Sequence, residues 1–125
     1  HPEDAKLALE YEVDGLIVSN HGGRQLDGVI ASIDALPEII KVVEGKIPVL
    51  FDSGVRQGVD AVKAMALGAQ AVLIGRPYYY GLALHGEKGV RNVMERLLQE
   101  TEVTLALSGV NQLSDISKIG IRKDR

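Results

Sequence analysis

Three short apolar runs divide the chain, and polar or small residues follow each of them. The runs cover residues 15–19, 48–52 and 71–75 and are rich in leucine, isoleucine and valine. A strand that is buried on both faces has a continuous apolar run of this kind, whereas a half-exposed strand alternates apolar and polar residues. The pattern therefore predicts three strands of a parallel sheet whose faces are covered by helices.

Helical segments are predicted before, between and after these strands. Pro2, followed by two acidic residues, is typical of a first helical turn, because carboxylates are stabilised at a helix N-terminus. Pro37 predicts a second helix start, and Gly45 is expected to end that helix. Gly68 is a typical left-handed residue after a helix. The expected helices cover residues 2–11, 37–43, 58–67, 77–84, 88–107 and 111–116.

Strands that alternate with helices occur in two architectures, both of the α/β class. One is the open doubly wound sheet and the other is the eight-stranded (β/α)₈ barrel. The spacing of the strands does not choose between them. In both architectures, however, ligands and catalytic groups lie at the carboxyl ends of the strands. Candidate chemistry is therefore expected in the residues that follow each apolar run.

Composition and charge argue against several classes of function. The 125 residues are 46% hydrophobic and 25% charged, which is typical of a globular domain with one core. A net charge of −3 without a basic block argues against nucleic-acid binding, and no apolar run reaches the ~20 residues of a membrane span. The absence of cysteine excludes disulfides and thiolate chemistry, so we expect a reducing compartment, the cytoplasm, and no metal site.

Two groups of residues on the later helices are interpreted without a functional role. The tyrosines at 78–80 are expected to pack in the core or at its rim. The charged residues at 95–102, Glu100 among them, are expected to form a solvated helix face.

A dense cluster of polar residues follows the first strand, where residues 19–27 read SNHGGRQLD. His21 can accept and return a proton near neutral pH, and Arg24 offers a planar pair of donors for a carboxylate. A base beside such a group suits an α-substituted acid, held by its carboxylate while the base acts on the adjacent carbon or its hydroxyl. The alternative is a loop histidine and a surface arginine with no role in chemistry.

Both later strands end in small residues that are followed by an arginine and a helix. Residues 52–56 read DSGVR, and residues 75–77 read GRP. Amide donors, a guanidinium and a helix N-terminus together bind anions. If these are the last two strands of a barrel, the two loops form a phosphate site. Tight turns with solvated arginines are the alternative interpretation.

In these segments the chain resembles the FMN-dependent α-hydroxy acid oxidases and dehydrogenases, which include glycolate oxidase, lactate oxidase and flavin-type lactate dehydrogenase. Residues 19–27 are similar to the family's signature, and residues 51–58 and 74–77 match its next two landmarks in order and spacing. The resemblance covers essentially the whole chain. It implies the C-terminal half of a TIM (β/α)₈ barrel, with strands six to eight, and makes residues 1–125 a fragment of one larger domain.

The resemblance also implies roles for the residues at the strand ends. His21 would be the catalytic base and contact the substrate, whose carboxylate Arg24 would bind. Ser19 would contact the flavin ring of FMN, and Asp52 would hold the ribityl hydroxyls. Ser53 stands where many members have glycine, a change compatible with a backbone donor. The residues expected to hold the FMN phosphate are Ser53, Gly54, Val55, Arg56, Gly75 and Arg76.

The activity that the resemblance implies is oxidation of a small (S)-2-hydroxy acid, with lactate preferred, to the 2-oxo acid. An N-terminal half of the same barrel would supply the first five strands, including an aspartate to pair with His21, a second arginine and a lysine against the flavin. The complete enzyme is expected to be a homo-oligomer, and the 125 residues alone are expected to be inactive.

Three other interpretations stay open. Another phosphate-binding barrel enzyme, such as type 2 isopentenyl-diphosphate isomerase or inosine-monophosphate dehydrogenase, shares the glycine–arginine loops but lacks the pair formed by His21 and Arg24. A non-catalytic half-barrel would bind phosphate or FMN without turnover. A structural fragment would bury its two open sheet edges by self-association.

Overall fold

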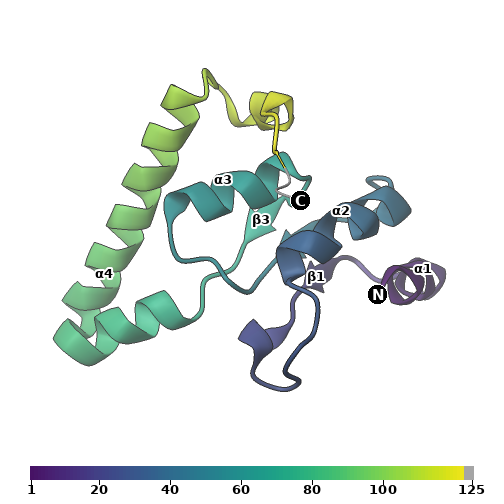
Figure 1. Ribbon diagram of the computed structural model, residues 1–125, viewed down its shortest axis with the longest axis horizontal. Coiled ribbons are helices and arrows are strands. Elements are labelled where there is room, and N and C mark those ends of the chain that lie inside the picture. The colour runs from purple at the N-terminus through teal and green to yellow at the C-terminus, as the bar shows by residue number, and fades with distance from the viewer. Residues whose placement is uncertain (123–125) are drawn as a thin grey trace.

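The computed structural model describes residues 1–122, and a parallel sheet of three short strands forms its centre (Figure 1). The strands are β1 (Leu16–Val18), β2 (Val49–Phe51) and β3 (Ala71–Val72), in the spatial order β1-β2-β3. The predicted parallel sheet is confirmed, and each strand is shorter than its apolar run. The strands are short because the residues that follow them leave the sheet to form the loops described below.

Helices connect the strands and pack on one face of the sheet. Within residues 1–122 the α-helices are α1 (Pro2–Glu10), α2 (Ser32–Val43), α3 (Gly58–Ala66) and α4 (Arg76–Leu107), and the 3₁₀ helices are η1 (His21–Gly23) and η2 (Leu113–Lys118). Helix α2 packs on β1 and β2, α3 packs on β3, α1 packs on α2, and α4 packs on α3. The last short helix was expected over residues 111–116, but it forms two residues later, as the 3₁₀ helix η2. Its N-cap is Gln112, not Asn111. No helix within residues 1–122 combines the length and the apolarity that crossing a bilayer requires.

The hydrophobic core lies between the sheet and its helices. Leu36 and Val43 of α2 and Val49 of β2 are almost completely buried, and Val18 and Phe51 belong to the same cluster. Each such side chain contributes about 1.5–3 kcal/mol when it is fully buried. This burial joins α2 to two strands and so fixes where both strands end.

Only one face of the sheet is covered by the described helices. Val18 and Phe51 are register partners and are buried, whereas their neighbours Ile17 and Leu50 point to the opposite face. Ile17 is 53% exposed. The prediction that both faces of the sheet are buried is therefore confirmed for one face only. The other face of the sheet is apolar but exposed.

The predicted start of the second helix at Pro37 is wrong. Helix α2 begins at Ser32 and continues through Pro37, although proline removes one backbone donor. Leu36, Ile39 and Val43 form one buried stripe, and this burial stabilises the helix on both sides of the proline. The expected end near Gly45 is confirmed, because Glu44 is left-handed at the C-cap.

Helix α4 consists of two arms, as the sequence predicts. His85 and Gly86 have non-helical backbone angles, and the chain bends sharply there, so that the two arms form the V seen in Figure 1. The arms approach most closely at two glycines. A Cβ at Gly81 would lie 2.5 Å from the carbonyl oxygen of Gly89, and a Cβ at Gly89 would overlap the carbonyl oxygen of Gly81. Backbone therefore packs directly on backbone between the two arms.

We expect Gly89→Ala to lower the free energy of unfolding by about 1–3 kcal/mol, as overpacking a closed contact does. The change is informative because alanine is the better helix former by ~1 kcal/mol, so only the contact can make it destabilising. Urea unfolding of the chain measures the effect. Gly120→Ala is the matched control, because a Cβ there meets nothing within 4 Å. An unchanged free energy of unfolding for Gly89→Ala would contradict the close packing of the arms.

Candidate functional site

The carboxyl ends of the three strands meet at one edge of the sheet. Just beyond the strands, the Asp52 N–H donates to the Val18 carbonyl (2.9 Å) and the Leu73 N–H donates to the Phe51 carbonyl (2.8 Å). These bonds keep the strand ends level, and a cavity of about 710 Å³ lies between the loops that follow. Its lining residues are His21, Gly22, Arg24, Asp52, Ser53, Gly54, Val55, Arg56, Leu73, Gly75, Arg76, Pro77, Tyr79 and Tyr80. The structure thus brings together every site residue predicted from the sequence except Ser19.

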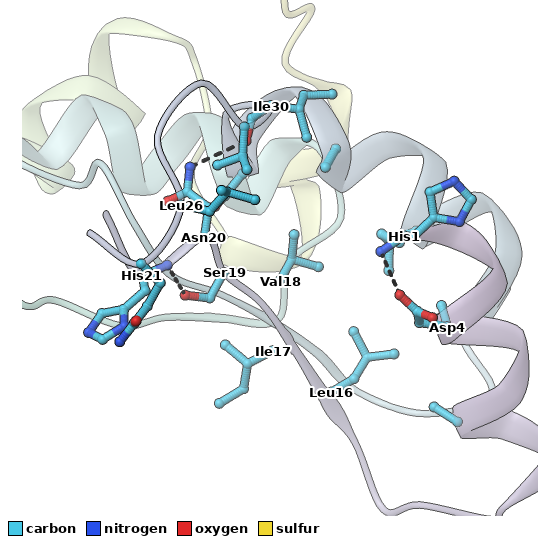
Figure 2. Close-up of a pocket in the computed structure, with 17 residues that line it drawn as sticks. His1, Asp4, Leu16, Ile17, Val18, Ser19, Asn20, His21, Leu26 and Ile30 are labelled. Carbon is cyan, nitrogen blue, oxygen red and sulfur yellow. Dashed lines mark hydrogen bonds and ion pairs between the residues drawn. The ribbon is translucent and has the colours of Figure 1, made fainter. Parts of the chain in front are cut away.

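Ser19 lines a second cavity, of about 510 Å³, on the open side of β1 (Figure 2). His21 lines both cavities. The Ser19 hydroxyl donates to Asp52 Oδ2 (2.6 Å) and accepts from the His21 N–H (3.1 Å). Ser19 is therefore connected to the first cavity through its hydrogen bonds, although it does not line it.

Ser53 joins the second strand end to the first. Its Oγ accepts from the N–H groups of Asn20 (3.3 Å) and Gly22 (3.0 Å), and it donates to Asp52 Oδ2 (3.1 Å). Three consecutive N–H groups, at residues 20–22, are thus held by two hydroxyls that share one carboxylate oxygen. The Ser53 side chain faces this turn, which leaves its backbone N–H as the group that could meet a phosphate.

The turn that carries His21 has an uncommon backbone. His21, Gly22 and Gly23 all have positive φ, at 56°, 65° and 71°. The left-handed region is easy for glycine and costs about 1 kcal/mol or more for a residue with a side chain. His21 and Arg24 are exposed, and within residues 1–122 their side chains form no hydrogen bond with another residue. The backbone is fixed, and the imidazole and guanidinium remain available to a ligand.

Carboxylates occupy the N-terminus of α3. Asp60 Oδ2 accepts from the N–H groups of Arg56 and Gln57, each at 3.0 Å. Glu100 Oε2 accepts from the Gly58 N–H at 2.9 Å. The N–H groups of residues 56–58 are therefore used within the chain and do not contribute to the expected anion site. The hydrogen bonds of the described residues leave the N–H groups of Gly54 and Val55, which lie one turn earlier, available.

The first cavity is positively charged. Arg24, Arg56 and Arg76 line it, and Asp52 is the one carboxylate among its lining residues. The Arg76 guanidinium lies against the histidine turn, because a Cβ at Gly22 would be 3.1 Å from Arg76 Nη2. Arg76 also begins α4, whose first N–H groups and dipole favour an anion. The arrangement can bind a phosphate or a carboxylate.

Tyr79 and Tyr80 contribute to the same cavity, whereas the sequence led us to expect that the tyrosines at 78–80 pack in the core or at its rim. Tyr79 and Tyr80 are 59% and 62% exposed. Tyr79 stacks on Tyr78 with ring centroids 4.5 Å apart, and the neighbouring Tyr79 side chain raises the pKa of Tyr78. Their position at the start of a helix that follows a strand end is the signal that could have identified them.

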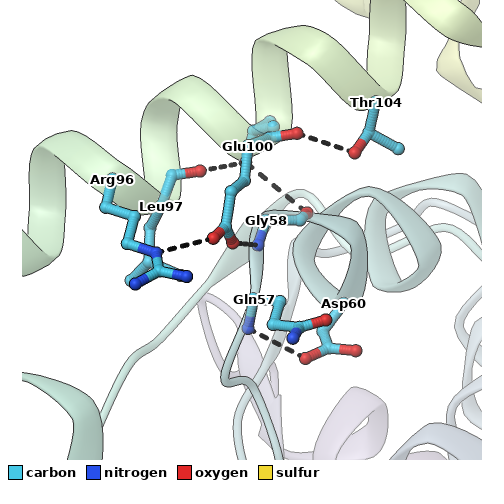
Figure 3. A network of polar contacts seen from close by, with 8 residues as sticks. Gln57, Gly58, Asp60, Arg96, Leu97, Glu100 and Thr104 are labelled. Atoms are coloured by element: carbon cyan, nitrogen blue, oxygen red, sulfur yellow. Dashed lines mark hydrogen bonds and ion pairs between the residues drawn. The ribbon is translucent and has the colours of Figure 1, made fainter.

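The expectation that Glu100 belongs to a solvated helix face is wrong, because its carboxylate is bound by other parts of the chain (Figure 3). Its carboxylate binds the Gly58 N–H and, through Oε1, Arg96 Nε at 2.9 Å. The hydrogen bond from Gly58, followed by that from Arg96, lowers the pKa of Glu100 below its ordinary value of 4.5. A Cβ at Gly58 would lie 2.6 Å from Glu100 Cβ, so only glycine fits this contact. Glu100 therefore fastens α4 to the loop that ends at Gly58.

Comparison with known proteins gives concordant matches. A family model described as FMN-dependent dehydrogenase matches residues 1–123. L-lactate oxidase of Lysinibacillus sphaericus is 57% identical over 99% of this chain and 32% of its own length. Peroxisomal (S)-2-hydroxyacid oxidase GLO3 of Arabidopsis thaliana is 57% identical over 98% of this chain and 34% of its own. A mandelate oxidase structure with a monooxide FMN adduct superposes with a TM-score of 0.94 at 42% identity, over 99% of this chain and 40% of its own. The chain spans about a third of the curated relatives that it matches.

The lowered pKa of Glu100 gives a test of the contact between α3 and α4. Ionised Glu100 stabilises the fold above its unfolded pKa, and this stability is lost as the pH falls through the lower folded pKa. We therefore expect Glu100→Gln to be less stable than the unchanged chain at about pH 7 and the difference to shrink by about pH 3. Urea unfolding at both pH values measures it.

Glu95→Gln, on an exposed position of the same helix, is the matched control and should show no such pH-dependent difference. A destabilisation by Glu100→Gln that is the same at both pH values would contradict an ionised role for this carboxylate.

Proposed function

Because the chain belongs to the family of FMN-dependent dehydrogenases, we propose that it forms strands six to eight of a (β/α)₈ barrel, with residues 1–125 as one fragment of that domain. The open apolar face at Ile17 and Leu50 supports this, since a barrel interior would cover it. The cavity beside β1 gives further support, because Leu16, Ile17 and Val18 line it along the unpaired edge, where a preceding strand fits.

An N-terminal half of the same barrel is the partner that this proposal requires. It would cover the two open edges of the sheet and complete the walls around His21. We propose that the complete enzyme is a homo-oligomer in a reducing compartment, the cytoplasm, and that the 125 residues alone bind a phosphate-bearing ligand without turnover. Without that N-terminal half, the uncovered apolar face of the sheet would cause the chain to self-associate.

The residues of the first cavity fit FMN. We assign the phosphate to the N–H groups of Ser53, Gly54 and Val55, to Gly75, and to the guanidinium groups of Arg56 and Arg76. Three arginines and one carboxylate line this cavity, so its charge favours an anion. The N-terminus of α4, which begins at Arg76 in the cavity wall, favours an anion as well. Asp52 would hold the ribityl hydroxyls and Ser19 the flavin ring. FMN, when bound, would supply the capacity to accept two electrons.

The proposed reaction is the oxidation of a small (S)-2-hydroxy acid, with lactate preferred, to the 2-oxo acid. Arg24 would bind the substrate carboxylate through two parallel hydrogen bonds, and His21 would take the proton from the reacting end. Both residues lie on one turn, so a substrate held by Arg24 reaches His21 without leaving the cavity. The observation that carries the proposal is that His21, Arg24 and the residues assigned to the phosphate line one cavity.

The test uses a chimeric oxidase, in which this chain replaces the matched segment of the L-lactate oxidase of L. sphaericus. We expect His21→Gln to retain FMN, because the assigned phosphate contacts lie on other loops. Its rate of flavin reduction by L-lactate should fall by about 10²–10⁴-fold, the usual effect of losing a general base. Anaerobic stopped-flow absorbance of the flavin measures that rate.

His85→Gln is the matched control, since His85 lies exposed at the bend between the arms of α4 and should leave the rate unchanged. A His21→Gln chimera that reduces its flavin as fast as the unchanged chimera would remove His21 from the mechanism.

A further inference from the structure

We propose that Ser53 is a positioning residue: its hydroxyl holds the turn that carries His21, and the placement of the base depends on it. The inference rests on the proposed role of His21 as the base. It gives the Ser53 side chain a role that differs from the phosphate contact of its backbone.

The backbone of Ser53 indicates that its side chain is retained for a purpose. Its φ is 85°, in the left-handed region where glycine is free of strain and serine is not. The loop would therefore form more easily with glycine at this position. The hydrogen bonds of the hydroxyl offset the strain, and they all lead to the first and second strand ends.

The hydrogen-bonding capacity of Ser53 is fully used. A hydroxyl has one donor and two acceptor positions. Ser53 Oγ fills them with Asp52 Oδ2 and with the N–H groups of Asn20 and Gly22, and Ser19 Oγ also lies within hydrogen-bond distance, at 3.2 Å. These two N–H groups lie immediately before and after His21 in the chain. Ser53 therefore binds the backbone on both sides of the proposed base.

The turn has two hydrogen bonds within its own backbone, from the Gly23 N–H to the Asn20 carbonyl (3.0 Å) and from the Arg24 N–H to the His21 carbonyl (3.4 Å). Neither of them holds the N–H groups at residues 20–22, which depend on the two serine hydroxyls. His21 has a φ of 56°, and its own N–H is held only by Ser19 Oγ. Gly22 follows with a positive φ of its own. A turn of this kind moves easily once its hydrogen bonds are removed. An error of about 1 Å in the placement of a catalytic group can lower the rate by about 100-fold.

Two substitutions separate the hydroxyl from the backbone strain. Ser53→Ala keeps a side chain at positive φ but removes every hydrogen bond. Ser53→Gly relieves the strain and leaves space in which a water molecule can take over part of the hydrogen bonding. If the hydroxyl positions the turn, activity should fall in the order serine, glycine, alanine. If only strain or shape mattered, alanine would resemble serine.

The test measures steady-state lactate oxidation by the chimeric oxidase. We expect Ser53→Ala to lower kcat by about 10-fold or more. The KM for lactate should change by less than about 3-fold, because Arg24 still binds the carboxylate. The flavin content per chain should stay unchanged, since the phosphate contacts assigned to residue 53 are made by its backbone.

Ser32→Ala is the matched control. Ser32 is 5% exposed, and its hydroxyl has no hydrogen-bond partner within residues 1–122, so its removal should leave kcat unchanged. Normal kcat for Ser53→Ala, or loss of FMN in proportion to the loss of kcat, would overturn the positioning role. His21→Gln, measured in parallel, reports on the proposed function independently of this result.

Discussion

The parallel register of the three strands is the constraint on which the site depends. Val18 lies opposite Phe51, and the hydrogen bonds from Asp52 to Val18 and from Leu73 to Phe51 continue that register into the loops. A slip of one residue would reverse the faces of a strand and move its loop away from its neighbours. Because the register is fixed by buried side chains on α2 and β2, the chemistry at the strand ends is a consequence of core packing.

Within residues 1–122, carboxylates at the strand ends occupy some of the hydrogen-bond donors and leave the arginines of the first cavity unpaired by them. Asp52 binds the hydroxyls of Ser19 and Ser53 and so orders the histidine turn. Asp60 and Glu100 fill the N-terminus of α3. With those donors occupied, the positive charge that remains belongs to the arginines of the cavity and to the start of α4. We propose that an anion binds at this place, between the second and third strand ends.

Sequence reasoning succeeded where the signal is local. Continuous apolar runs identified the strands, and the site residues predicted directly after them all line the first cavity, except Ser19. It failed where a contact joins distant parts of the chain. In the sequence, Glu100 is one of several charged residues on a helix. Nothing near it in the sequence indicates its hydrogen bond with the Gly58 N–H, 42 residues away. The start of α2 was missed because burial of Leu36 and Ile39 outweighs the local preference of Pro37. Asp60 had a usable signal in the spacing from Gln57, which is that of a capping box.

We propose that the ends of β2 and β3 form one phosphate site for FMN. Fluorescence titration of the flavin-free chimeric oxidase with FMN and with riboflavin, which lacks the phosphate, tests this site. We expect FMN to bind about 10-fold or more tightly than riboflavin, in keeping with charge-assisted hydrogen bonds. Arg76→Met should remove most of that difference and leave riboflavin binding unchanged. Equal affinity for the two flavins, or an FMN preference that survives Arg76→Met, would show that the two strand ends do not form a phosphate site.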